Sequence, residues 1–99
     1  MRSCYTLRLD EARIAIADLC DYYGTGMILT RINVPEKYRG QGHANALLKQ
    51  VLDDADREGV RLYLEIQSSD GLSYDELERW YLRNGFARWR GIYRRLPQK

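Results

Sequence analysis

The sequence predicts an α/β domain with a central mixed sheet and helices on both faces. Three observations favour this fold class. Two segments of alternating polarity at the N-terminus predict an antiparallel hairpin. A strand, an amphipathic helix and a second strand follow, and predict a parallel unit with a right-handed crossover. A second helix and a final hairpin complete the pattern. With 99 residues the chain can bury one core but not two, so residues 1–99 are expected to form a single domain.

The first hairpin is predicted from two runs that share a period of two. Residues 4–9 alternate apolar and polar side chains, as a half-buried strand does. Residues 12–19 repeat the alternation, with Ile14 and Ile16 at its apolar positions. The acidic pair between the two runs supplies the turn.

The parallel unit is predicted to begin with a strand over residues 27–34, which Pro35 ends. A helix is expected from about residue 42 to residue 58, because apolar residues then recur along one stripe and Gly59 stands where a C-terminal glycine belongs. The stripe consists of Ala44, Leu47, Leu48, Val51, Leu52 and Ala55. Residues 61–67 are rich in bulky side chains and predict the second parallel strand.

The second helix has a clear start signal. Ser73 and Glu76 have the spacing of a capping box, in which each side chain bonds the other residue's backbone N–H. Apolar and aromatic residues follow on one face, and Gly85 closes the helix. Residues 86–95 then predict a hairpin that turns near Gly91.

Composition excludes several classes of protein. The net charge is only +2, so the molecule as a whole does not demand an anionic partner. Cys4 and Cys20 lack the spacing of a disulfide framework or a zinc site, so we expect no metal and a reducing, cytoplasmic setting. Neither a signal peptide nor a membrane span is expected.

Basic residues gather near the C-terminus, at Arg88, Arg90, Arg94, Arg95 and Lys99. A solvated hairpin face is the simpler interpretation, and a phosphate-bearing ligand is the alternative.

The stretch YRGQGHAN, residues 38–45, places two glycines between the predicted strand and the long helix. Glycine leaves neighbouring amides unshielded, so the backbone of Arg39, Gly40, Gln41, Gly42, His43 and Ala44 could wrap an anion at the positive end of the helix. A diphosphate is the anion most suited to such a loop. The common dinucleotide and P-loop fingerprints are not met. From this loop alone, anion binding and close backbone packing remain equal alternatives.

Two motifs separated by about forty residues favour anion binding over close packing for this loop. The pattern R-x-x-G-x-A begins at Arg39, and Y-x-x-x-G-F begins at Tyr81. In this order, on β-α-β-α-β, they resemble the GCN5-related N-acetyltransferases over roughly residues 27–96.

The resemblance implies acetyl-coenzyme A as co-substrate. The loop amides would hold its pyrophosphate, and the first parallel strand, splayed from the second, would pair its backbone with the pantetheine arm. An amide near Val34 would face the thioester oxygen and stabilise charge growing on it. Coenzyme binding is thus expected at Ile32, Asn33, Val34, Arg39, Gly40, Gln41, Gly42, His43 and Ala44. The 3′-phosphate is expected on the C-terminal arginines together with Lys37 and Arg39.

The reaction implied is transfer of the acetyl group to a primary amine by direct attack on the thioester. Tyr81 matches the family tyrosine and would protonate the departing thiolate, although a packed aromatic residue is the alternative. Glu65, in a position similar to the catalytic glutamate of ribosomal-protein N-terminal acetyltransferases, would act as base through a water. Glu36 is the second candidate for the general base, and His43 is a weaker candidate.

Two departures from the family pattern bear on the partners. Tyr74 occupies the position of a frequent family asparagine and follows an inserted-looking segment, residues 67–73. The family's two helices between its first strands are replaced here by a turn, which leaves the acceptor groove open. The acceptor is then large, such as a protein, or a second subunit of a homodimer encloses a small amine.

Two other functions stay open as alternatives: a non-catalytic acyl-coenzyme A-binding module, and a nucleic-acid-binding protein acting through the C-terminal arginines. The latter is disfavoured, because Asp53, Asp54 and Asp56 on the first helix would repel a polyanion.

Overall fold

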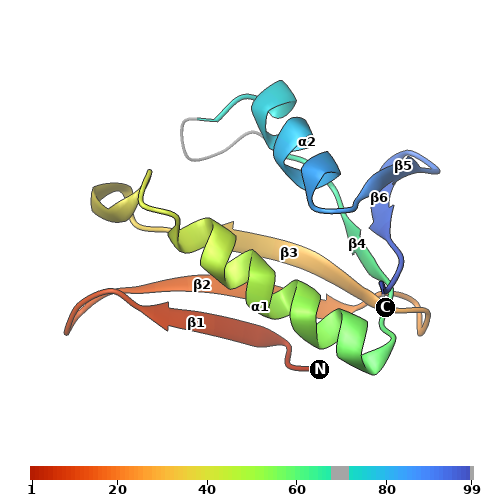
Figure 1. The fold of residues 1–99 in the computed structure, drawn as a ribbon, viewed down its shortest axis with the longest axis horizontal. Coiled ribbons are helices and arrows are strands. Elements are labelled where there is room, and N and C mark those ends of the chain that lie inside the picture. The colour runs from red at the N-terminus through yellow and green to blue at the C-terminus, as the bar shows by residue number, and fades with distance from the viewer. Residues whose placement is uncertain (68–71, 99) are drawn as a thin grey trace.

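The computed structural model describes residues 1–67 and 72–98, which form a six-stranded sheet and two α-helices (Figure 1). The strands lie in the order β1-β2-β3-β4-β6-β5, with β3 and β4 parallel and the other neighbours antiparallel. This confirms the predicted mixed sheet with one parallel pair. In chain order the elements are β1 (Cys4–Arg8), β2 (Ile14–Asp21), β3 (Met27–Asn33), the 3-10 turn η1 (Glu36–Tyr38), α1 (His43–Glu58), β4 (Leu62–Leu64), α2 (Tyr74–Arg83), β5 (Ala87–Trp89) and β6 (Ile92–Arg95).

Both helices begin and end where the sequence signals place them. Gly59 caps α1 in a left-handed conformation, with φ of 70°, and its N–H donates to carbonyls of the last turn. At α2, Ser73 and Glu76 form the expected reciprocal pair, and both hydrogen bonds measure 3.2 Å. No helix in the described ranges is long and apolar enough to cross a bilayer.

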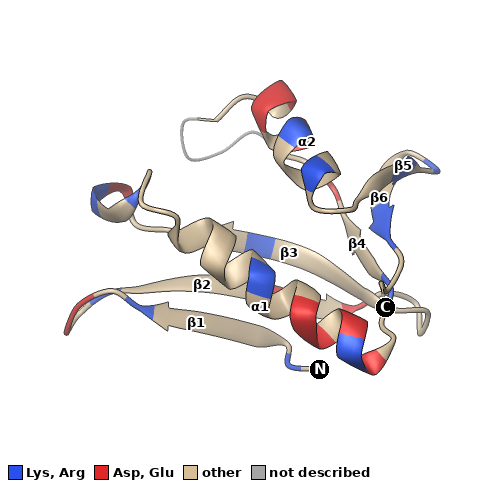
Figure 2. Cartoon of the chain, viewed as in Figure 1, with Lys and Arg blue, Asp and Glu red and all other residues tan. Residues whose placement is uncertain are grey.

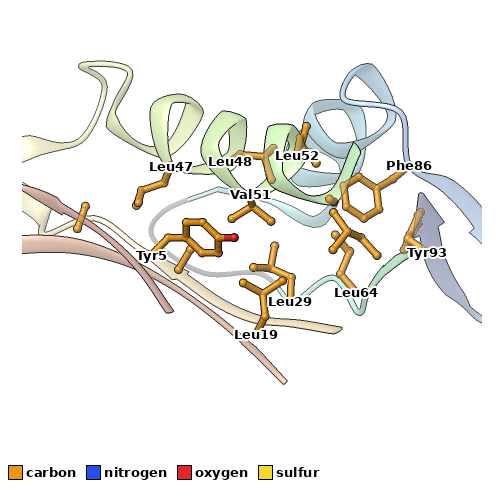
Figure 3. Packing of buried hydrophobic residues seen from close by; sticks show 14 of the residues in the cluster. Tyr5, Leu19, Leu29, Leu47, Leu48, Val51, Leu52, Leu64, Phe86 and Tyr93 are labelled. Atoms are coloured by element: carbon orange, nitrogen blue, oxygen red, sulfur yellow. The ribbon is translucent and has the colours of Figure 1, made fainter. Parts of the chain in front are cut away.

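Both helices pack on the same face of the sheet, so the prediction of helices on both faces is wrong for the described residues (Figure 3). On β6, the Tyr93 hydroxyl donates to Glu78 of α2, while Arg95, on the same face of that strand, bonds Asp56 of α1. The reason is topological. The two crossovers advance across the sheet in the same direction, and two right-handed crossovers of that kind put their helices on one side.

The core lies between this face and α1. In β2 the buried residues are Ala15, Ala17 and Leu19, whereas Ile14 is 47% exposed. The expectation that the isoleucines mark the apolar face of this strand is therefore wrong. Alanine side chains let the helix approach the sheet closely, and the leucines and Val51 of α1 fill the space above them (Figure 3).

The parallel pair parts after a short ladder. Only Met27–Leu29 pairs with Leu62–Leu64, after which β4 ends while β3 continues beside β2 to Asn33. The predicted strand over residues 61–67 is thus wrong beyond Leu64. A bulge near Thr30 shifts the register of β3 against β2, and bulges bend the strand that carries them. The splay leaves the β3 edge from Thr30 to Asn33 without a neighbouring strand among the described residues.

An ion pair between a buried arginine and a half-buried aspartate joins the C-terminal strand to α1. The Arg95 guanidinium is only 5% exposed and grips Asp56 with two bonds, of 2.7 and 3.0 Å. Its Nε donates to the Asn84 carbonyl at 2.9 Å, and the Gln98 N–H donates to the same carboxylate at 2.8 Å. The hydrogen bonds from Arg95 are the main cause that lowers the pKa of Asp56.

Acid is expected to destabilise the fold through such carboxylates. The pKa of Asp56 and that of Glu78, which accepts from Tyr93 and Arg88, both lie below their ordinary values in the folded chain. A depressed pKa adds stability that is fully present above the unfolded-state value of about 4, and this is lost as the pH falls further. Thermal melts should therefore show a Tm that is flat from neutral pH to about pH 5 and then declines. An unchanged Tm at pH 3 would contradict this.

Candidate active site

A groove of about 1060 Å³ opens where β3 and β4 part. The end of β3 and residues 64–67 form its floor, the start of α1 closes one side, and one face of α2 forms the other. Its lining carries four arginines and two glutamates, so it is suited to an anion: Arg31, Arg39, Arg79, Arg83, Glu65 and Glu76.

Six consecutive backbone N–H groups at the start of α1 have no acceptor among the described residues. Those of Gly40, Gln41 and Gly42 bond no oxygen of the described residues, and the first three amides of the helix precede any helical partner. No side chain caps this end of the helix, and its first turn carries no acidic residue. All acidic residues of α1 lie in its second half (Figure 2). This end of the helix therefore offers free donors to an anion.

The glycines are required for this arrangement of the loop. Gly40 and Gly42 have φ of 77° and 84°, in the left-handed region that other residues rarely adopt. A Cβ at either position would meet nothing within 4 Å, so conformation rather than crowding explains the glycines. Close packing, the alternative that the sequence left open, is thereby disfavoured.

The predicted loop residues are not equivalent. Gly40, Gly42, His43 and Ala44 line the groove, whereas Gln41 is exposed and does not. The N–H of Arg39 already donates to the Glu36 carbonyl at 3.2 Å, so the free amides begin one residue later than predicted. The Arg39 side chain instead braces the end of β3, with Nε donating to the Val34 carbonyl at 2.9 Å. With Ile32 and Asn33, Val34 lines the groove as expected.

A contact that the sequence did not suggest anchors this loop. The Tyr38 hydroxyl donates to Asp10 in the turn between β1 and β2, and the Tyr38 ring meets His43 edge-on at 6.2 Å. Asp10 also accepts from the N–H groups of Ala12 and Arg13. These bonds, with Tyr38 the largest cause, lower the pKa of Asp10 to about 2. The sequence shows Asp10 only as a turn residue, because its partner lies far along the chain.

Tyr81 lies in the wall of the groove formed by α2. Its ring packs against Trp80 and Phe86, with centroid distances of 4.8 and 5.6 Å. Its hydroxyl forms no hydrogen bond with the described residues, and burial raises its pKa to about 12. A half-buried phenol that keeps its proton and has no partner among the described residues is free to donate to a ligand.

Glu65 lies just past the end of β4, where its side chain is exposed and lines the groove. The strand predicted over residues 61–67 ends one residue before Glu65, yet Glu65 lines the same groove as Tyr81. Glu36 is exposed in η1 and does not line the groove.

Among the groove residues that were not predicted are Asn45, Arg79, Trp80 and Arg83, on the α1–α2 side. The Trp80 Nε1–H donates to Asn45 Oδ1 at 2.6 Å, which fixes α2 against the first turn of α1. Arg79 and Arg83, on either side of Trp80 in sequence, also line the groove. Their spacing of four residues on a helix was the signal available.

The C-terminal arginines do not line the groove. Arg88 pairs with Glu78, Arg95 is buried against Asp56, and Arg90 and Arg94 lie over the Trp89 ring. Lys99 and residues 68–71, part of the inserted-looking segment, lie outside the described residues. Among those that are described, no group of three His, Cys, Asp or Glu residues could hold a metal ion.

One family model and two solved structures are similar to this chain. A family model described as GCN5-related N-acetyl-transferase matches residues 4–65. No curated protein sequence matches the chain. The crystal structure of the anti-CRISPR protein AcrVA5 is similar in fold, with a TM-score of 0.65 and 17% identity over 94% of this chain and 98% of that one. The ribosomal-protein-S18-alanine N-acetyltransferase from Escherichia coli has a TM-score of 0.70 and 20% identity over 92% of this chain and 66% of that one.

Proposed function

Because the chain belongs to the family of GCN5-related N-acetyltransferases, we propose that it transfers an acetyl group from acetyl-coenzyme A to a primary amine. One observation carries the proposal. A row of free N–H groups at a helix start lies beside an unpaired strand edge, in the same groove as an unbonded tyrosine hydroxyl. A diphosphate, an amide-containing arm and a thioester, joined in this order, would match these three features.

The coenzyme would bind mainly to backbone. Its pyrophosphate would accept from the amides of residues 40–45, where charge-assisted bonds and the helix dipole favour an anion. Its pantetheine amides would pair with the β3 edge between Thr30 and Asn33, as an added strand does. An amide near Val34 would then donate to the thioester oxygen and stabilise the tetrahedral oxyanion.

In the reaction, the amine nitrogen attacks the thioester carbon, a C–N bond forms and the C–S bond breaks. Glu65 accepts the amine proton through a water, and Tyr81 gives its proton to the departing sulfur. A phenol with a pKa near 12 is a weak acid for this step. The apolar wall that raises the pKa of Tyr81 also desolvates the thiolate, which makes the sulfur more basic and favours the transfer.

The direct test is calorimetric titration with acetyl-coenzyme A, followed by a thiol-release assay over polyamines, amino acids, aminoglycosides and peptide N-termini. Binding with turnover supports the enzyme, whereas binding without turnover on any amine favours a non-catalytic acyl-coenzyme A-binding module. Absence of binding contradicts both.

Replacing Tyr81 with phenylalanine is expected to lower kcat at least about tenfold without changing affinity for acetyl-coenzyme A. The ring contacts with Trp80 and Phe86 remain, and only the unbonded hydroxyl is lost. Calorimetry and thiol-release kinetics on the same preparation separate the two effects. Unchanged turnover would remove Tyr81 from the mechanism.

Replacing Glu65 with glutamine is expected to slow the reaction at neutral pH and to make the rate climb as the pH approaches the pKa of the amine. Without a base, turnover depends on amine that is already deprotonated. Glu36→Gln is the matched control, since that carboxylate lies outside the groove lining. A pH–rate profile of the Glu65 variant parallel to that of the unaltered protein would contradict the assignment.

The acceptor is proposed to be a protein or a small amine enclosed by a second copy of the chain. No described helix covers the sheet face opposite α1 and α2, and Ile14 is exposed there. The homodimer remains a prediction. Cys4 and Cys20 are both exposed and unpaired, which favours a reducing compartment, so the proposed place of action is the cytoplasm.

A further inference from the structure

Two arginines of α2 line the groove without contributing a described contact to the fold. Arg79 and Arg83 are exposed, and neither forms a hydrogen bond or ion pair with a described residue. Other exposed arginines do pair with carboxylates: Arg13 with Asp10, Arg31 with Asp18, Arg57 with Asp54 and Arg88 with Glu78. Folding contacts therefore do not account for this pair.

The spacing of the two arginines makes them unfavourable neighbours in the free protein. Residues four apart lie on the same face of a helix, and like charges there repel. The one acidic side chain of α2 that lines the groove is Glu76, whose carboxylate is engaged with the Ser73 N–H in the capping box. An anion bound between the two guanidinium groups would relieve the repulsion.

Trp80, which lies between the two arginines in sequence, fixes their position relative to the free amides. Trp80 bonds Asn45, the last residue of the row of free N–H groups, so this part of α2 is held against the start of α1. Figure 2 shows the two basic positions of α2 along this helix. The arginines thus lie on the wall that adjoins the proposed pyrophosphate site.

Building on the proposed function, we infer that Arg79 and Arg83 bind the 3′-phosphate on the ribose of the coenzyme. The pyrophosphate already has the backbone amides, whereas the 3′-phosphate is a separate monoester that carries close to two negative charges at neutral pH. Guanidinium groups bind such phosphates through paired hydrogen bonds. The C-terminal arginines, which the sequence suggested for this role, lie outside the groove lining.

The test compares coenzyme A with 3′-dephospho-coenzyme A by calorimetry at fixed ionic strength. The unaltered protein should bind coenzyme A about tenfold more tightly, the difference expected for hydrogen bonds to a charged group. The variant Arg79→Gln/Arg83→Gln should bind both compounds with the weaker affinity. The control Arg61→Gln/Arg90→Gln removes the same charge from exposed sites outside the groove lining and should keep the difference.

Two results would overturn the inference while leaving the proposed function intact: equal affinity of the unaltered protein for the two compounds, or equal weakening of both by the α2 variant, which would place the arginines on the pyrophosphate. Failure of the unaltered protein to bind either compound would overturn the proposed function and this inference with it. Thermal melts of each variant confirm that these surface changes leave the chain folded.

Discussion

Alanine at both Gly40 and Gly42 is expected to weaken acetyl-coenzyme A binding at least about 100-fold, which corresponds to the loss of two or so hydrogen bonds to a charged group. Both glycines hold left-handed conformations, which cost other residues roughly 1–2 kcal/mol each. The loop would relax toward ordinary angles and turn its N–H groups away from a common point. Calorimetry with acetyl-coenzyme A measures the loss.

The matched control is Gly24→Ala/Gly59→Ala. These glycines have φ of 72° and 70°, and a Cβ on either would also meet nothing within 4 Å, but both lie outside the groove lining. The two double variants should therefore lose similar stability, and only the first should lose affinity. Equal affinities in the two variants would show that the loop conformation is not what binds the ligand.

Replacing Arg95 with methionine is expected to remove a substantial part of the stability of the fold. The change removes a buried guanidinium from the Asn84 carbonyl and from Asp56, whose side chain is 26% exposed and keeps the Gln98 N–H as donor. The expected loss is about 3 kcal/mol, at the lower end of the range for breaking a fully buried pair. Domains of this size are typically stable by only about 5–15 kcal/mol. Urea unfolding followed by circular dichroism measures the difference.

Two further variants show whether the unpaired charge is what destabilises Arg95→Met. Arg88→Met removes an arginine that is 74% exposed and leaves Glu78 with Tyr93 as donor, so it should cost only about 1 kcal/mol. The double change Arg95→Met/Asp56→Leu removes both charges and should recover part of the loss, because no unpaired charge is left behind. A double variant as unstable as Arg95→Met would mean that lost packing of the arginine stem, rather than the charge, is responsible.

Local signals in the sequence predicted the elements well, and tertiary arrangement was where prediction failed. The ends of α1 and α2 follow from Gly59 and from the Ser73–Glu76 pair, which act within one helical turn. The end of β4 at Leu64 could not be predicted, because residues 65–67 continue the same bulky pattern. What stops the strand is the departure of β3, a property of two segments far apart in sequence.

In the candidate site, too, local features could be predicted from the sequence and contacts between distant residues could not. Motif spacing identified the glycine loop and Tyr81, since each is defined within a few residues. It could not distinguish buried Arg95 from its exposed neighbours in a run of arginines, nor join Tyr38 to Asp10. It also pointed to the C-terminal arginines for the 3′-phosphate, and none of these lines the groove. The arginines of α2 that do line it were overlooked because they are interspersed with acidic residues.

The short ladder between β3 and β4 has a consequence for engineering. Within residues 1–67 and 72–98, these three residue pairs form the strand pairing that joins the two halves of the sheet, and the proposed substrate entrance lies where the pairing ends. Lengthening this pairing would strengthen the protein and close that entrance in the same step. Stabilising substitutions should therefore avoid the β3–β4 pairing and be placed at the edge strands of the sheet.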